Sequence, residues 1–124
     1  MHKTREAIDE QQKAEFIKES NKLIAEFMGN TYEKGLGHLV VNMDTHKNYI
    51  SSEHMKYHSS WDWLMPVNKK IRTIKYESNG SGNKKASEAY KWGINLGLYI
   101  SDINTSWVAI VKFIKWYNTN TANN

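Results

Sequence analysis

The stretch that decides the fold is Tyr-Lys-Trp-Gly-Ile-Asn-Leu-Gly-Leu-Tyr-Ile, residues 90–100. Every second residue of this stretch is apolar, a period typical of a strand with one buried face. A single strand of this length would span roughly 40 Å, which is unusually long. Gly93 and Gly97 therefore indicate a bend, a bulge or a tight turn. The pattern predicts one bent strand or a hairpin over residues 88–100.

A second strand is predicted over residues 36–43, where two β-branched valines lie at the centre of the segment. The polar, histidine-rich segment 44–59 is predicted to be a long loop, with a short strand near Tyr49. Residues 77–87 are predicted to form a flexible polar loop. The strand segments would pair into a small antiparallel or mixed sheet.

Three amphipathic segments predict helices that cover this sheet. They are residues 5–28, residues 60–75 and a last helix that begins between Asp102 and Thr105. Each carries apolar residues at three- and four-residue spacing. The expected fold class is therefore α+β, a helix–sheet–helix sandwich of about three helices on a small sheet.

The length of 124 residues predicts a single domain over residues 1–124. Residues 1–15 are expected to be a polar helical extension, and residues 118–124 a disordered tail. No apolar run approaches the roughly 20 residues of a membrane span. The absence of cysteine and of an apolar leader segment favours a cytoplasmic location.

The charge is distributed unevenly along the chain. Residues 1–33 hold five Lys/Arg against seven Asp/Glu, and residues 34–124 hold twelve against six, which gives the net charge of +4. Much of the excess lies within residues 69–91. Such a cluster suits phosphates or an acidic protein surface. The alternative is that these side chains merely solvate helix faces, which the scarcity of arginine favours.

Motifs for catalysis and metal binding are absent from the sequence. His54 and His58 are four residues apart, but no HExxH pattern surrounds them. There is no cysteine and no GxSxG motif, and the glycine-rich segment 79–85 lacks the spacing of a P-loop. We therefore expect a protein that is not an enzyme, with no catalytic residues, no metal site and no cofactor.

Aromatic residues are in excess, with five Trp and seven Tyr. Exposed Trp and Tyr are typical anchors of protein interfaces and also stack on nucleic-acid bases. The residues predicted to pack in the core are Trp63, Trp92 and Trp107. The residues left open to a surface role are Tyr57, Trp61, Tyr99 and Trp116.

Three blocks of the chain carry a family resemblance: LIAEFMG at residues 23–29, YHSSWDWLMPV at 57–67 and VAIVKFIKWYN at 108–118. They resemble small uncharacterised proteins of bacteriophages and of Bacteroidetes, similar to phage ABA-sandwich proteins. The middle block is the most specific. The resemblance implies a helix–sheet–helix sandwich and supplies no catalytic residues. This chain departs from the family in its polar residues 1–18 and in the basic Asn68-Lys69-Lys70.

The first functional hypothesis is a non-enzymatic phage-type interaction protein that inhibits host antiviral defence, as anti-CRISPR proteins do. It would bind an effector protein or a ribonucleoprotein of the host. The expected contact residues are Tyr57, Trp61, Lys69, Lys70, Arg72 and Lys84.

Two further hypotheses stay open at this point. The protein could instead bind a nucleotide or small ligand, for example as a sponge for a signalling nucleotide. It could also bind nucleic acid directly through residues 69–91, with a log–log salt slope near −5 for about six neutralised phosphates. The sequence leaves the oligomeric state undecided.

Overall fold

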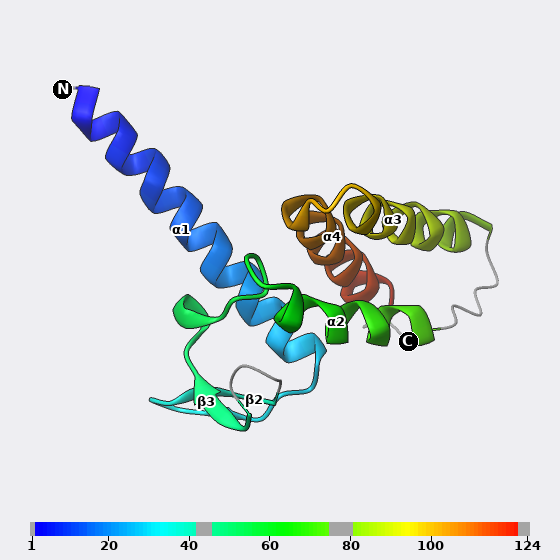
Figure 1. Cartoon of the computed structure of the whole chain (residues 1–124), viewed down its shortest axis with the longest axis horizontal. Coiled ribbons are helices and arrows are strands. Elements are labelled where there is room, and N and C mark those ends of the chain that lie inside the picture. The colour runs from blue at the N-terminus through cyan, green and yellow to red at the C-terminus, as the bar shows by residue number, and fades with distance from the viewer. Residues whose placement is uncertain (1, 42–45, 75–80, 122–124) are drawn as a thin grey trace.

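The structure is a computed structural model that describes residues 2–41, 46–74 and 81–121, with side chains over 9–41, 46–74 and 88–119. Over these described residues it has four α-helices, one short 3-10 helix and a three-stranded antiparallel sheet (Figure 1). In chain order the elements are α1 (His2–Phe27), β1 (Tyr32–Glu33), β2 (Gly37–Val40), β3 (Asn48–Ile50), η1 (Ser52–His54), α2 (Trp61–Thr73), α3 (Ser81–Tyr99) and α4 (Ile103–Thr121). The predicted α+β class is confirmed.

The sheet is antiparallel in the order β1-β2-β3. The strand predicted within residues 36–43 is β2, and the short strand predicted near Tyr49 is β3. Gly37 has a φ of +99°, and a Cβ there would lie 2.2 Å from the carbonyl oxygen of Ile50. Only glycine therefore lets β2 approach the end of β3 this closely.

The strand or hairpin predicted over residues 88–100 is wrong, because these residues belong to α3 up to Tyr99. The side of α3 that is turned inward carries Tyr90, Ile94, Gly97 and Leu98. This spacing of four, three and one residues is that of a helical face. The period of two in the sequence was therefore a coincidence of composition.

The glycines of α3 serve close packing against α4. A Cβ on Gly97 would lie 2.1 Å from Ser106 Oγ and 2.5 Å from the Ser106 backbone nitrogen. Ser106 in turn donates its hydroxyl to the carbonyl of Ile94 at 2.7 Å. The glycines that were predicted to bend a strand therefore allow α3 and α4 to pack in close contact.

Two predicted irregular segments are shorter than expected. Of the loop predicted over 77–87, residues 81–87 are helical in α3, and residues 77–80 lie outside the described residues. Of the tail predicted from residue 118, the part up to Thr121 belongs to α4. The last helix begins as expected, since the Asp102 carboxylate accepts bonds from the Asn104 backbone nitrogen at 3.1 Å and from Thr105 Oγ1 at 3.0 Å.

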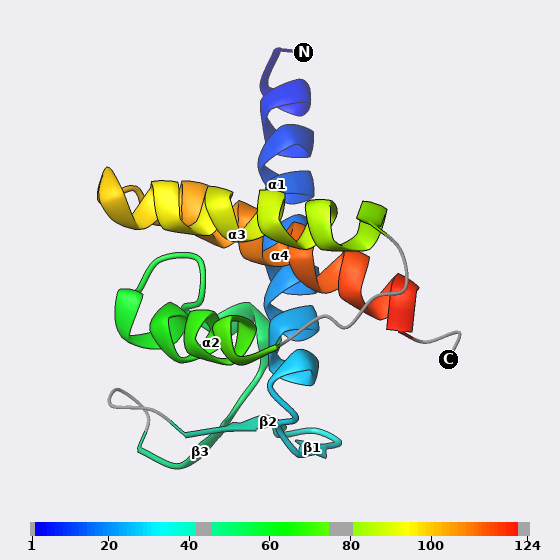
Figure 2. The same cartoon turned by 90° about the vertical axis from the view of Figure 1, so that its right-hand side faces the viewer.

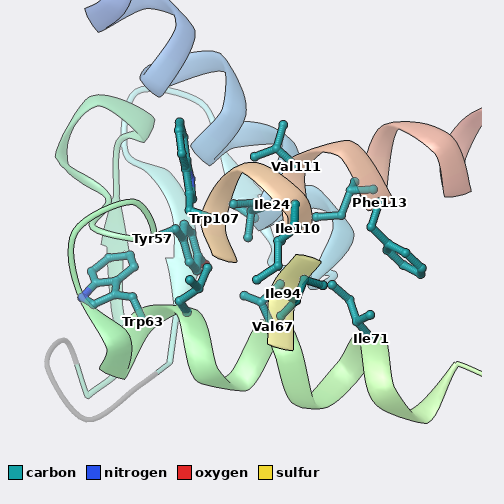
Figure 3. Packing of buried hydrophobic residues seen from close by; sticks show 14 of the residues in the cluster. Ile24, Tyr57, Trp63, Val67, Ile71, Ile94, Trp107, Ile110, Val111 and Phe113 are labelled. Carbon is teal, nitrogen blue, oxygen red and sulfur yellow. The ribbon is translucent and has the colours of Figure 1, made fainter. Parts of the chain in front are cut away.

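The hydrophobic core lies where α1, α2, α3 and α4 meet (Figure 3). Trp63 from α2, Phe113 from α4 and Ile24 from α1 are its largest fully buried side chains. The first half of α1 extends away from the other elements, and its described side chains from residue 9 to Phe16 are exposed (Figures 1 and 2). None of the helices in the described residues is both long and apolar enough to span a membrane.

Candidate protein-interaction surface

Exposed side chains of α2 and α3 form a surface that we call the α2–α3 face. Its members are Met65, Lys69 and Arg72 of α2 and Trp92, Asn95 and Tyr99 of α3. The two helices are joined by a hydrogen bond in which Arg72 Nη2 donates to Asn95 Oδ1 at 3.2 Å. Figure 2 shows α3 and α2 one above the other on the side that faces the viewer.

The aromatic part of this face follows from the packing of α3. Gly97 and Ile94 turn one side of the helix toward α4 and the core, so the opposite side is left to solvent. Trp92 and Tyr99 stand on that opposite side, 67 % and 88 % exposed. They are seven residues apart, two helical turns, with Asn95 between them. Large aromatic side chains this exposed are typical of interaction sites.

The basic part of the face borders a hollow of about 510 Å³ on α2, lined by Met65, Pro66, Asn68, Lys69 and Arg72. Asn68 is 3 % exposed, and its amide nitrogen has no hydrogen-bond partner among the described residues. A buried donor without an acceptor costs free energy. These five lining residues include no acidic side chain, so the hollow offers cations and apolar contact to an acceptor group.

Carboxylates do flank the face at its two ends. Asp62 in the first turn of α2 and Glu88 of α3 are both exposed. Glu88 lies one turn before Trp92 on the same side of the helix. The positive charge is therefore concentrated at Lys69 and Arg72 and does not extend over the whole face.

Of the six contact residues predicted from the sequence, Lys69 and Arg72 are exposed on this face. Lys70 is half-buried, donates a hydrogen bond to the Phe27 carbonyl and lies 4.6 Å from the centre of the Phe27 ring. It thus holds the carboxyl end of α1, where a cation is favourable, and is not free to meet a partner. Lys91 caps the carboxyl end of α2 in the same way, because its ammonium group donates a hydrogen bond to the Ile74 carbonyl at 3.1 Å.

Tyr57 is a core residue, so its predicted role as a surface contact is wrong. It is 3 % exposed and meets the Trp63 ring edge-on at 5.1 Å. Burial raises the pKa of its hydroxyl to about 12, although a hydrogen bond from Asn30 acts in the opposite direction. Trp61 is half-buried against the core. The backbone of Lys84 lies in α3, but its side chain is outside the described part of the chain.

Trp92 and Met65 are members of the face that the sequence reasoning missed. Trp92 was expected in the core with Trp63 and Trp107, and only the latter two are buried. Counting residues 88–99 by the helical period, with the glycines as inward positions, places Trp92 on the outside. That signal was present in the sequence but was obscured by the alternation.

The histidines predicted to lie in the loop have separate surroundings. His58 is half-buried and its Nδ1 lies 3.2 Å from the amide nitrogen of Asn21, while burial lowers the pKa of its imidazole. His54 is exposed, with Nε2 3.9 Å from Glu53 Oε1. Over the described ranges, no three His, Cys, Asp or Glu residues come together as a metal site.

Comparison of the chain with protein-family models, with curated proteins and with solved structures gave no significant match. The resemblance to phage ABA-sandwich proteins therefore stays a prediction from three sequence blocks. Function has to be inferred from the geometry of the α2–α3 face.

Proposed function

We propose that this protein is a non-enzymatic interaction protein that binds an acidic protein surface through its α2–α3 face. The observation that carries the proposal is the Arg72–Asn95 hydrogen bond, which holds a cation of α2 against α3 at a residue that lies between Trp92 and Tyr99 in the sequence. Trp, Tyr and Arg are the residues that dominate binding energy at protein interfaces.

The aromatic rings supply the apolar part of such an interface. Trp92 and Tyr99 are held on a helix that packs tightly against α4, so little conformational freedom of the backbone is lost on binding. Covering exposed apolar area contributes about 25 cal/mol per Å² removed from water. An aromatic pair two turns apart can therefore anchor a partner helix or strand.

The hollow on α2 determines which charge the protein prefers on its partner. A glutamate or aspartate that enters it would meet the cationic side chains of Lys69 and Arg72. Hydrogen bonds to a charged group are stronger than neutral ones, at about 1.5–3 kcal/mol. The hollow thus favours an acidic side chain over a basic one.

The class of partner follows from the sequence and stays a prediction. The three blocks that resemble phage proteins make an effector protein or ribonucleoprotein of host antiviral defence our proposed target. Such effectors expose acidic protein surfaces or nucleic acid, and the α2–α3 face suits the former. In this proposal the protein inhibits its target by covering a surface.

The test is affinity capture with a variant of the face and a matched control. The wild type, a double variant Trp92→Ala/Arg72→Gln and a control Tyr49→Ala are immobilised and exposed to lysate of the cell in which the protein acts. Tyr49 is an exposed aromatic of β3, far in sequence from the face, so its loss matches the loss of Trp92 in kind. Captured proteins are quantified by mass spectrometry at low and high salt.

We expect a partner that the wild type and the control retain equally and that the face variant loses by about tenfold or more. Its retention should fall with salt, because the contact includes exposed charges. Equal capture by all three proteins would refute the role of the α2–α3 face. A wild-type dimer in light scattering that Trp92→Ala dissociates would assign the face to a second copy of the chain instead.

A further inference from the structure

A second region with converging polar groups lies between α1 and the sheet, away from the α2–α3 face. Two adjacent hollows there share Lys22, Tyr32 and His38, and we call them together the hairpin groove. Their volumes are about 340 and 540 Å³, within the usual 300–1,000 Å³ of small-ligand sites. α1 descends onto the sheet at this place (Figure 2).

The first hollow is basic. Lys18 and Lys22 are one turn apart on α1 and point along the same side of the helix. Neither forms an ion pair with another residue that the structure describes. Ser51, Ser52 and the turn between β1 and β2 line the same hollow. Two ammonium groups and two hydroxyl groups that line one hollow are a typical setting for a phosphate.

One carboxylate lies close to this basic hollow. Ser51 Oγ donates to Glu53 Oε1 at 3.4 Å, and both groups are on the exposed side. Glu53 does not line the hollow itself, and it is also 3.9 Å from His54 Nε2. Among the described residues, the lining of the first hollow thus contains two lysines and no acidic side chain.

The second hollow offers hydrogen-bonding groups of another kind. It is lined by Glu26, Gly29 and Asn30 in addition to the three shared residues. A carboxylate and a carboxamide are the groups that read the donor and acceptor edges of nucleobases. Glu26 would repel a phosphate, so the two hollows differ in the part of a ligand that each can take.

An aromatic ring stands at the border of the two hollows. Tyr32 is 57 % exposed, and its ring meets the His38 ring at 5.0 Å and an angle of 65°. His38 supports it from below and is itself only 3 % exposed. A tyrosine ring fixed by such a contact presents a flat face on which a base can stack.

We propose that the hairpin groove binds a nucleotide, with its phosphate at Lys18 and Lys22 and its base against Tyr32. An uneven distribution of charge carries the inference: Lys18 lines only the first hollow, Glu26 and Asn30 line only the second, and Lys22 lies between them and lines both. The sugar then spans the border beside His38. Burial lowers the pKa of that imidazole, which keeps its ring neutral near the sugar.

The experiment is a titration of the full ¹⁵N-labelled chain, followed by two-dimensional NMR, with AMP, GMP, CMP, UMP and inorganic phosphate as separate probes. We expect at least one nucleotide to shift the amide signals of Gly35, Ser51 and Ser52. We expect inorganic phosphate to bind at least about tenfold more weakly, because it lacks the stacking contribution. Shifts confined to α3 would overturn the proposal.

Variants separate the two halves of the groove. The double variant Lys18→Gln/Lys22→Gln should weaken nucleotide binding by about tenfold or more, and so should Tyr32→Leu. Lys13→Gln is the matched control, because Lys13 is exposed on α1 outside the groove. The variants change exposed side chains, and melting temperatures check that each still folds.

Three further outcomes would overturn the inference. The first is no shift with any nucleotide at millimolar concentration, and the second is phosphate binding as tight as nucleotide binding. The third is an affinity for single-stranded RNA that rises with its length and exceeds that of the nucleotides, which would assign the lysines to an RNA backbone. None of these outcomes bears on the α2–α3 face, so the two proposals fail separately.

Discussion

Gly97→Ala tests the packing of α3 on α4, from which the α2–α3 face follows. A Cβ at this position would lie 2.1 Å from Ser106 Oγ, 2.5 Å from the Ser106 backbone nitrogen and 2.9 Å from the Asp102 carbonyl oxygen. Two of these atoms are backbone and cannot rotate away, so overpacking should cost about 3 kcal/mol. The higher helix propensity of alanine stabilises the folded state by about 1 kcal/mol, which offsets part of this cost. The net loss is about 2 kcal/mol, or a melting temperature lower by about 8 °C.

The assay is thermal and urea unfolding followed by circular dichroism, with Gly93→Ala as the control. A Cβ on Gly93 would meet only the Ala109 Cβ at 3.1 Å, a contact that small shifts relieve. The propensity gain then offsets the strain, and the control should stay within about 1 kcal/mol of the wild type. A Gly97→Ala variant as stable as the wild type would refute the close approach of α3 to α4.

The remaining predictions concern single side chains. Trp92→Ala should change the free energy of unfolding by less than about 0.5 kcal/mol in urea titrations, because the ring is mostly exposed; a loss of several kcal/mol would place it in the core. Asp102→Ala should lower stability by about 1 kcal/mol in the same assay through loss of the cap of α4, and no change would mean that the cap bonds are not formed. Asn68→Leu should raise stability by about 1 kcal/mol by removing a buried amide nitrogen without a partner, and a destabilised variant would contradict this. Burial lowers the pKa of His58 in the folded chain, so protons bind the unfolded chain more readily: the free energy of unfolding should fall as pH drops below about 6.5 and should not depend on His58 above it. His58→Gln should reduce that fall in urea titrations between pH 7.5 and 5.5, and an unchanged slope would contradict it.

The sequence allowed the fold class, the short sheet and three of the helices to be predicted. It failed at α3 because the residues that pack inward there include Gly97, which no hydrophobicity pattern counts as buried. Glycine is a poor helix former in isolation, and here tertiary contact with Ser106 overrides its propensity. Trp92 points outward from α3, but it was counted as one of the inward apolar residues of a strand. This made the apolar residues appear to recur at every second position.

The candidate surface was predicted in part for the same reason. Lys69 and Arg72 fall on the outer side of an ordinary amphipathic helix, so their exposure follows from periodicity alone. Lys70 has its partner at the end of α1, and Tyr57 has its partner, Asn30, in the turn after α1, so both contacts are at long range in the sequence. Such tertiary pairings leave no local pattern, and no count of spacing could have assigned them.

Hydrogen–deuterium exchange of the protein alone and bound to its captured partner would locate the contact surface directly. We predict slower exchange on binding over residues 65–73 of α2 and 92–99 of α3, with the sheet and the first half of α1 unchanged. Protection confined to α1 or to the sheet would show that the chain meets its partner elsewhere, and that the exposed tryptophan of α3 has no part in recognition.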